Sequence, residues 1–538
     1  MSTRRWSRFA GCSFALAILA CCASNSAESA PDSATASAPP SRPALAPLEL
    51  PAIFGDGMVL QRGPSAPVWG RARAGETVRV QLFGVDAISV CDTQTVANSA
   101  GEWRVQLTDL TAGGPFRLEV RGEGERTCTI EDVLVGDVWL GSGQSNMRMN
   151  AVACDHFEEA RDHADLPSLR IFCEASMPAA EPQWRGSGEW VRCSPATCGS
   201  FPGALLWFGM ELRERLEVPI GLVDSSVGGS RIEHWISAPP QFASPAVGRY
   251  ATERDAEFWC FDHDRARRDF LQRRQQWQQT VEVASMRGEP LPQRPRSRAE
   301  GHLRHGGVGH LFNAKIAPLC TYGLRGFLWY QGEDNVLNAN YYGAQLELLI
   351  ADWRARWGRG DLPFCWVQLP NFADGRARAD WPRIREEMRR ALCIANTGMV
   401  VAIDVGMSHD IHPTNKLAIG QRLAGWALSE VYGLPEARTS PLFVGHAIQG
   451  RRVAVCFAPT YGRLSPIDRN LDWFELAGRD GRWHPARAHV GGRDGQYVVV
   501  ESDAVPEPVD VRYAWEDDPA VELVNAAGLP ATPFTTQD

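Results

Sequence analysis

The stretch Val138-Trp-Leu-Gly-Ser-Gly-Gln-Ser-Asn-Met147 joins an uninterrupted apolar run to a serine that stands close to two glycines. Apolar runs without alternation are typical of strands buried on both faces of a parallel sheet. Similar runs follow along the chain at 222–225, 327–330, 364–369 and 399–404. These runs predict the strands of one parallel sheet.

Helical patterns separate the runs. Apolar residues recur every three or four positions in 204–216 and again in 341–357, as they do on the buried face of a helix. They are Leu205, Phe208, Leu212 and Leu216 in the first helix, and Tyr342, Leu346, Leu349, Trp353 and Trp357 in the second. Strands that alternate with helices predict an α/β domain, expected over 131–433, with helices on both faces of the sheet. In such sheets ligands bind at the carboxyl ends of the strands.

Regions of a different pattern flank and interrupt this domain. Residues 48–130 hold short strands of period two, such as 102–107, and no helical pattern, and strand patterns return in 434–538. Each region predicts an antiparallel β domain. Residues 240–305, with a charged helix at 265–279, do not fit the alternation and predict an insertion in the α/β domain.

The first 47 residues predict export. Residues 1–22 combine a positively charged start with a short apolar run, which is the pattern of a signal peptide. Cys21 stands where a bacterial lipoprotein would be cleaved and acylated, so a lipid anchor at this cysteine is one hypothesis. Residues 23–47 are rich in Ala, Ser and Pro, as flexible linkers are. We expect a periplasmic protein or an outer-membrane-anchored lipoprotein, with secretion as the alternative.

Composition limits the remaining classes. The 538 residues carry a formal charge of −9, which gives no electrostatic support for nucleic-acid binding. With 44% hydrophobic residues, the bulk of the chain can bury a core. After the signal no apolar run is long enough to cross a membrane, and the cysteines lack zinc-finger spacing. We expect no metal and no organic cofactor; disulfide pairing and oligomeric state stay open.

Four polar segments stand at the ends of predicted strands: Gly141–Met147, Asp224–Ser230, Trp329–Asn335 and Ser408–Asn415. A serine after a buried strand is placed for nucleophilic attack, paired glycines present backbone N–H groups, and a histidine before a helix suits a general base. Each segment alone also has a structural explanation, such as a serine that caps the following helix. Together they supply a nucleophile, oxyanion donors and a base.

The four segments resemble, in the same order, those of the sialate O-acetylesterase family of SGNH hydrolases. Further stretches that resemble this family are Phe54–Gln61, Gly136–Trp139, Leu311–Ala314, Ala317–Leu319 and Gly528–Phe534. The resemblance covers about residues 50 to 535. It implies an SGNH-hydrolase fold, in which a flavodoxin-like parallel sheet lies between helices and is flanked by N-terminal and C-terminal antiparallel β domains.

The resemblance also implies catalytic roles. Ser145 would be the nucleophile and His412 the general base. The oxyanion hole would consist of the backbone N–H of Ser145, the backbone N–H of Gly229 (or Gly228), and the side-chain amide of Gln331. No cofactor takes part in such a reaction.

Two groups of roles are less closely defined. Gln144, Asn146 and Glu333 are expected to bind the substrate, with Glu333 alternatively holding its loop. The superfamily usually has an aspartate three residues before the histidine, where this chain has another histidine. Asp410 is the favoured third member of the triad; Asp404 and a backbone carbonyl are the alternatives.

These roles predict a serine carbohydrate O-acetylesterase that works through an acetyl-enzyme. Acetylated side groups of hemicellulose, on xyloglucan or xylan, are the favoured substrates, because an exported and tethered enzyme suits polymer breakdown. The alternative is O-acetylated sialic acid, whose carboxylate would require an arginine such as Arg148 or Arg231. A non-catalytic carbohydrate-binding protein and a lipid esterase are further hypotheses. The joint presence of Ser145, Gln331 and His412 disfavours the first, and the lack of a long apolar lid segment disfavours the second.

Overall fold

The computed structural model describes residues 48–124, 126–292, 294–376, 378–435, 438–467 and 469–537. The predicted signal peptide, Cys21 and the linker 23–47 lie outside the described residues. Residues 46–538 form one compact unit. Within the described part of this unit, no helix has the length and apolar character needed to cross a membrane, and no cluster of His, Cys, Asp and Glu side chains could hold a metal ion.

The N-terminal region is built from antiparallel strands, as predicted. Strand β3 pairs with β4 and β6, and β2 pairs with β5. The predicted alternation is confirmed in β5, where Trp103, Val105 and Leu107 are buried and the residues between them are exposed. The strands are β1 (Val59–Gln61), β2 (Ala66–Arg71), β3 (Thr77–Phe83), β4 (Ser89–Val96), β5 (Glu102–Leu107), β6 (Gly113–Arg121) and β7 (Thr127–Gly143).

Strand β7 connects this region to the central sheet. Its first half pairs antiparallel with β6, and its second half pairs parallel with β10 and β11. The predicted domain boundary at residue 130 therefore falls inside one continuous strand. The N-terminal strands and the α/β part also share one hydrophobic core, because apolar side chains from both pack together along β7.

The central sheet has the order β13-β12-β11-β7-β10-β8-β9, and all neighbouring pairs except β8–β9 are parallel. Its strands after β7 are β8 (Leu166–Glu174), β9 (Gly188–Cys193), β10 (Ile220–Ser226), β11 (Gly326–Tyr330), β12 (Phe364–Gln368) and β13 (Thr397–Val401). In chain order, β7, β10, β11, β12 and β13 lie in the spatial order 2-1-3-4-5 found in flavodoxin-like sheets. The predicted parallel sheet is confirmed; β8 and β9 were not predicted.

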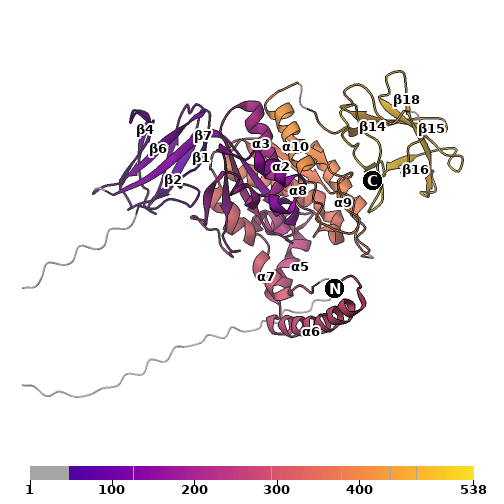
Figure 1. Ribbon diagram of the computed structural model, residues 1–538, viewed down its shortest axis with the longest axis horizontal. Coiled ribbons are helices and arrows are strands. Elements are labelled where there is room, and N and C mark those ends of the chain that lie inside the picture. Colours follow the sequence, from indigo (N-terminus) through magenta and orange to yellow (C-terminus); the bar gives the residue numbers. More distant parts are fainter. Residues whose placement is uncertain are drawn as a thin grey trace, which may run out of the picture. The chain divides into compact units, whose positions relative to one another are not determined.

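Helices cover both faces of this sheet (Figure 1). On one face Trp139 of β7 contacts Phe208 of α3, with ring centroids 5.3 Å apart. On the other face Trp329 of β11 contacts Trp353 of α8 at 6.0 Å. Trp329 pairs with Ser142, an odd number of residues from Trp139, so the two tryptophans point to opposite faces. The helices are α1 (Ser145–Arg148), α2 (Phe157–Asp162), α3 (Gly203–Leu216), α8 (Tyr342–Trp357), α9 (Trp381–Arg390) and α10 (Lys416–Trp426).

The segment predicted as an insertion is helical. It contains α4 (Ala238–Ala243), α5 (Gly248–Trp259), α6 (His263–Arg287) and α7 (Arg298–His305). Helix α6 includes the predicted charged helix and begins after Asp262, whose side chain caps it by accepting from Arg265 N. Helices α5 and α7 lie side by side (Figure 1), and His302 stacks on Phe258 with ring centroids 4.2 Å apart.

The C-terminal region consists of antiparallel strands with a hydrophobic core of their own, as predicted. One sheet is β14 (Leu442–Gln449), β15 (Arg452–Ala458), β19 (Tyr497–Glu501) and β18 (Arg487–Gly491); the other is β17 (Trp483–Pro485), β16 (Phe474–Ala477), β20 (Asp510–Tyr513) and β21 (Phe534–Thr535). The run at 399–404 was predicted as a strand, but strand β13 ends at Val401. Helix α10 is regular to Trp426, after which Ala427–Val431 is a π-helical turn.

Candidate active site

Ser145 lies at a sharp turn between β7 and α1. Gly143 has φ +135°, and a Cβ on it would clash with the carbonyl oxygen of Tyr330 in the neighbouring strand β11. Glycine is required there because it tolerates this backbone conformation and leaves room for the adjacent strand. Gln144 is extended, and Ser145 is the first residue of α1. The turn brings the serine to the carboxyl ends of the parallel strands, where its side chain is half-buried.

His412 lies beside this serine although 267 positions separate them in the chain. Its Nε2 is 2.8 Å from Ser145 Oγ. The histidine is held in the loop between β13 and α10, whose N-cap is Asn415. Burial lowers the pKa of His412, the positive charges of Lys416 and Arg296 lower it further, and Asp410 and Asp334 oppose the shift. The imidazole is therefore neutral near pH 7 and can accept the hydroxyl proton.

The carboxylate that faces His412 is Asp410. Its Oδ1 is 3.6 Å from His412 Nδ1 and accepts a hydrogen bond of 2.9 Å from the backbone N–H of His412. Asp404 instead forms two hydrogen bonds of 2.6 Å with the guanidinium of Arg422. Within the described chain no backbone carbonyl accepts from His412 Nδ1. Of the three expected alternatives, only Asp410 is close to the imidazole.

The turn at Gly228 and Gly229 adjoins Ser145. A Cβ on Gly228 would lie 3.5 Å from the Cβ and 4.0 Å from the backbone N of Ser145. Gly229 has φ +76°, and His305 Nε2 donates a hydrogen bond of 2.9 Å to Gly228 O. Among the described residues, no hydrogen bond uses the backbone N–H of Ser145, Gly228 or Gly229. The backbone N–H of Ser145 and those of the adjoining Gly228–Gly229 turn thus have no acceptor within the described residues.

Gln331 differs from its expected role as an oxyanion donor. The residue is fully buried, and its Nε2 donates to Gln144 Oε1 at 3.1 Å, Ser230 O at 3.2 Å and Asn335 Oδ1 at 2.7 Å. Its Oε1 accepts from the hydroxyl of Tyr342. The amide therefore points into the protein interior, where acceptors from several segments surround it. The geometry does not present this amide to Ser145.

The three residues expected to bind substrate are also buried. Gln144 is 2% exposed and donates to Asp334 Oδ2 at 3.0 Å. Asn146 is 1% exposed, and its Nδ2 donates to Glu333 Oε1 and to Ile411 O. Burial raises the pKa of Glu333 to about 7. Instead of facing a cavity, these side chains bind one another and neighbouring loops, so the alternative expectation that Glu333 holds its loop fits the structure better.

Ser145 opens on a cavity of about 560 Å³. Arg148 of α1 and Arg304 of α7 both line it, and both are exposed. Lys315 also lines it and forms a buried ion pair with Glu174. No local sequence pattern indicated Arg304 and Glu174, because both reach the cavity only through the packing of distant segments.

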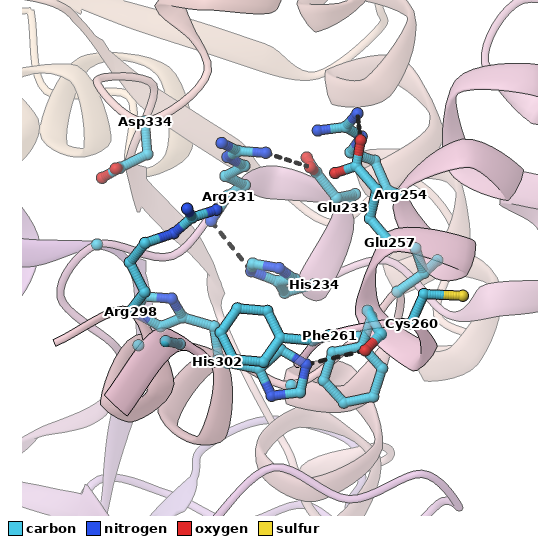
Figure 2. Close-up of a pocket in the computed structure, with 18 of the residues that line it drawn as sticks. Arg231, Glu233, His234, Arg254, Glu257, Cys260, Phe261, Arg298, His302 and Asp334 are labelled. Carbon is cyan, nitrogen blue, oxygen red and sulfur yellow. Dashed lines mark hydrogen bonds and ion pairs between the residues drawn. The ribbon is translucent and has the colours of Figure 1, made fainter. Parts of the chain in front are cut away.

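A second cavity of about 850 Å³ meets the same glycine turn at Gly229. Figure 2 shows Arg231, Arg298 and Asp334 toward one side of it. Arg231 lines this second cavity and not the Ser145 cavity, and its Nη1 lies 3.9 Å from Glu233 Oε1. Of the two arginines expected to meet a sialate carboxylate, only Arg148 therefore lies beside Ser145.

The chain is similar in sequence and in structure to known carbohydrate esterases. Residues 135–253 and 310–429 match the family described as carbohydrate esterase, sialic acid-specific acetylesterase, and the gap in the match falls on the helical insertion. The chain is 30% identical to the sialate O-acetylesterase of Mus musculus, over 89% of this chain and 92% of that protein, and 30% identical to that of Homo sapiens, over 70% and 69%. A carbohydrate acetylesterase from Xanthomonas citri has a similar structure, with a TM-score of 0.74 and 32% identity, covering 91% of this chain and 99% of that one.

Proposed function

The chain belongs to the sialic acid-specific acetylesterase family of carbohydrate esterases, which are carboxylic ester hydrolases, and from that premise we propose that Ser145 is its nucleophile and His412 its general base. The observation that carries the proposal is the distance of 2.8 Å between Ser145 Oγ and His412 Nε2. A neutral imidazole within hydrogen-bond reach of a serine hydroxyl is the arrangement that activates it.

The reaction proceeds in two halves. Ser145 Oγ attacks the acetyl carbonyl carbon while His412 Nε2 takes the hydroxyl proton. The tetrahedral intermediate collapses, the bond to the sugar oxygen breaks, and His412 returns the proton to that oxygen. Water, deprotonated by the same imidazole, then attacks the acetyl-enzyme and releases acetate, and Ser145 regains its proton.

The oxyanion of each tetrahedral intermediate is assigned to backbone donors. In support, the N–H groups of Ser145 and of the Gly228–Gly229 turn have no acceptor within the described residues, and Gly228 adjoins Ser145. Each such donor typically contributes about 2.7–4 kcal/mol of transition-state stabilisation. Asp410 is assigned the role of facing the imidazolium that forms on His412.

We assign the SGNH-hydrolase architecture to the α/β part. In support, Ser145, the Gly228–Gly229 turn and Gln331 follow β7, β10 and β11, which are adjacent strands with the same direction. His412 follows β13 and reaches the same edge. The export prediction from residues 1–22, with acylation at Cys21 as one form of it, remains part of the proposal.

The substrate is an O-acetylated saccharide, with two candidate classes. Hemicellulose is favoured by the predicted export and linker. An acidic saccharide such as O-acetylated sialic acid is favoured by the guanidinium groups of Arg148 and Arg304 in the Ser145 cavity, and by the names of the mouse and human relatives. Within the described residues Arg304 forms no ion pair, so it can meet a substrate carboxylate.

Acetate release tests the mechanism. The purified mature chain is incubated with acetylated xyloglucan, acetylated xylan and O-acetylated sialic acid, and acetate is measured for each. We expect release from at least one of them and none with Ser145→Ala, because the hydroxyl is the attacking group. Release that persists in Ser145→Ala would contradict the proposed nucleophile. No release by the folded wild-type chain from any substrate would contradict the proposed saccharide specificity.

Arg304→Gln tests the substrate class. If the substrate is acidic, kcat/KM for O-acetylated sialic acid should fall about tenfold or more, since a hydrogen bond to a charged group contributes about 1.5–3 kcal/mol. The rate with acetylated xylo-oligosaccharides should stay within about twofold. Arg268→Gln is the matched control, because it removes the same charge from α6 outside both cavities. Equal effects on acidic and neutral substrates would contradict carboxylate recognition by Arg304.

A further inference from the structure

The two carbonyl groups that flank His412 are both held by buried side chains. On the N-terminal side, Ile411 O accepts a hydrogen bond of 2.9 Å from Asn146 Nδ2. On the C-terminal side, Pro413 O accepts one of 2.7 Å from Lys416 Nζ. The two side chains are also joined to each other, since Lys416 Nζ donates to Asn146 Oδ1 at 2.7 Å. The peptide groups on both sides of His412 are thus held in place by hydrogen bonds.

Lys416 is an unusual residue for its position. It is the first residue of α10, it is fully buried, and both acceptors of its hydrogen bonds are uncharged amide oxygens. Its Nζ also lies 5.2 Å from the centre of the Tyr330 ring. Burial of an ammonium group without a directly bonded carboxylate is unfavourable. If Lys416 only filled space, an apolar residue would be more stable at this position. Its hydrogen bonds to Asn146 and Pro413 therefore indicate a specific role.

The same network reaches the nucleophile. Asn146 follows Ser145 directly in α1, and its Nδ2 also donates to Glu333 Oε1 in the loop after β11. Lys416 and Asn146 therefore connect the segment that carries the nucleophile to the segment that carries the base. We propose that Lys416 is a positioning residue that, together with Asn146, fixes His412 against Ser145 by holding the carbonyls on both sides of the histidine. This inference rests on the proposed roles of Ser145 and His412.

The position of Asp410 supports the positioning role of Lys416 and Asn146. Its side chain is 56% exposed, and its Oδ1 is 3.6 Å from His412 Nδ1, beyond a hydrogen bond. A carboxylate so placed attracts an imidazolium but does not fix its orientation. The backbone on either side of the histidine is fixed instead, by hydrogen bonds from the buried side chains of Asn146 and Lys416.

Lys416 has a second, electrostatic effect on His412. The charged groups that act on the imidazole are Asp410 in its own loop, Lys416 in α10, Arg296 before α7 and Asp334 after β11. Lys416 and Arg296 lower the pKa of His412, and the two aspartates raise it. Burial lowers the pKa of Lys416 itself to about 8, so it is predominantly charged at pH 7. Removal of this charge should therefore raise the pKa of His412.

The test uses Lys416→Met in the full mature chain, with an aryl acetate as substrate. We expect kcat to fall about 100-fold, as a misplacement of about 1 Å can cost that much, while KM changes less than about threefold. The acidic limb of the kcat/KM profile should move to higher pH. Lys416→Arg, which keeps charge and donors, should recover part of kcat and the wild-type acidic limb.

Two further variants separate positioning from stability. Arg422→Met removes another buried cation from α10, one that binds Val401 O and Asp404 and neither of the carbonyls that flank His412. It should lower the melting temperature and leave the acidic limb in place. If Lys416→Met does not fold, Asn146→Ser serves instead, because it removes the bond to Ile411 O and leaves Lys416. It should lower kcat about tenfold or more.

The outcomes are distinct from those for the proposed function. A folded Lys416→Met with wild-type kcat and an unmoved acidic limb would overturn the inference. An equal loss of kcat in Lys416→Met and Arg422→Met, with an unmoved acidic limb in both, would also overturn it. Where Asn146→Ser is the variant tested, wild-type kcat would do the same. Activity that survives in Ser145→Ala would instead remove the premise, whatever the lysine variants show.

Discussion

At the residue scale, Asp410 is the member of the site whose contribution is most easily measured. Its carboxylate lies 3.6 Å from His412 Nδ1 and is largely in solvent. Two unit charges about 4 Å apart in bulk water attract by about 1 kcal/mol. Asp410→Asn should therefore lower kcat by about five- to tenfold in steady-state kinetics with an aryl acetate. When the buried aspartate of a serine-protease triad is changed to asparagine, the loss is about 10⁴-fold.

The alternative outcome for this variant is equally informative. A loss of about 10³-fold or more would mean that Asp410 closes onto Nδ1 in the reacting complex and that His412 depends on it for orientation. Asp404→Asn is the matched control. It removes a carboxylate of similar sequence position that binds Arg422 and not the imidazole, so its effect should be on stability.

Three of the polar residues that were predicted to take part in the site are buried in the structure. Gln331, Asn146 and Glu333 follow strands, as substrate-binding residues often do. Gln331 was predicted as an oxyanion donor, and Asn146 and Glu333 as substrate-binding residues, with Glu333 alternatively holding its loop. All three are at most 2% exposed and bind other protein groups. Residue type and position at a strand end could predict that these residues belong to the site. They could not predict which of them face the substrate, because that depends on acceptors from several distant segments.

At the element scale, the site depends on the direction of β7, β10 and β11. The three strands are adjacent and parallel, so the segments that follow them end at one edge of the sheet. This was predictable from sequence, because apolar runs that alternate with helical patterns imply parallel strands. The length of β7 was not predictable: its alternating first half and its apolar second half gave two different strand patterns for one continuous strand.

The insertion helices contribute to the site in a way that no local pattern showed. Arg304 near the end of α7 lines the Ser145 cavity, and the next residue, His305, donates to Gly228 O beside Ser145. The sequence predicted a charged helix at 265–279 in this insertion, and α6 includes it and buries few of its residues. What α7 contacts is decided by packing, since its mixture of charged and small residues is compatible with solvent or with a polar cavity.

At the scale of the whole molecule, the buried carboxyl of Glu333 makes the stability of the fold depend on pH. Burial raises its pKa from 4.5 to about 7, so the folded chain holds this proton over a pH range in which the unfolded chain has lost it. The contribution of Glu333 to the free energy of unfolding is therefore largest below about pH 4.5 and is lost as the pH rises through 7. Glu333→Gln keeps an acceptor for Asn146 and should remove this part of the pH dependence.

Chemical denaturation of both proteins between pH 5 and 8 measures the effect. The difference in free energy of unfolding between wild type and Glu333→Gln should change in favour of the variant as the pH rises. Titrating groups that do not interact with Glu333 cancel in this difference, whereas Lys416 and Asp334 interact with it. A difference that stays constant over this range would mean that Glu333 titrates normally in the folded chain.

The sequence by itself determined the α/β class, the flanking antiparallel strands, and the nucleophile and base as candidates. These depend on local patterns: apolar periodicity, glycines at a turn, and a family motif carried by consecutive residues. Only the tertiary structure decided that Asp410 and not Asp404 faces His412, that Gln331 turns inward, and that Lys416 and Arg304 reach the site. The physical reason is that hydrogen bonds and ion pairs form between groups far apart in the chain, and their direction depends on how complete elements pack.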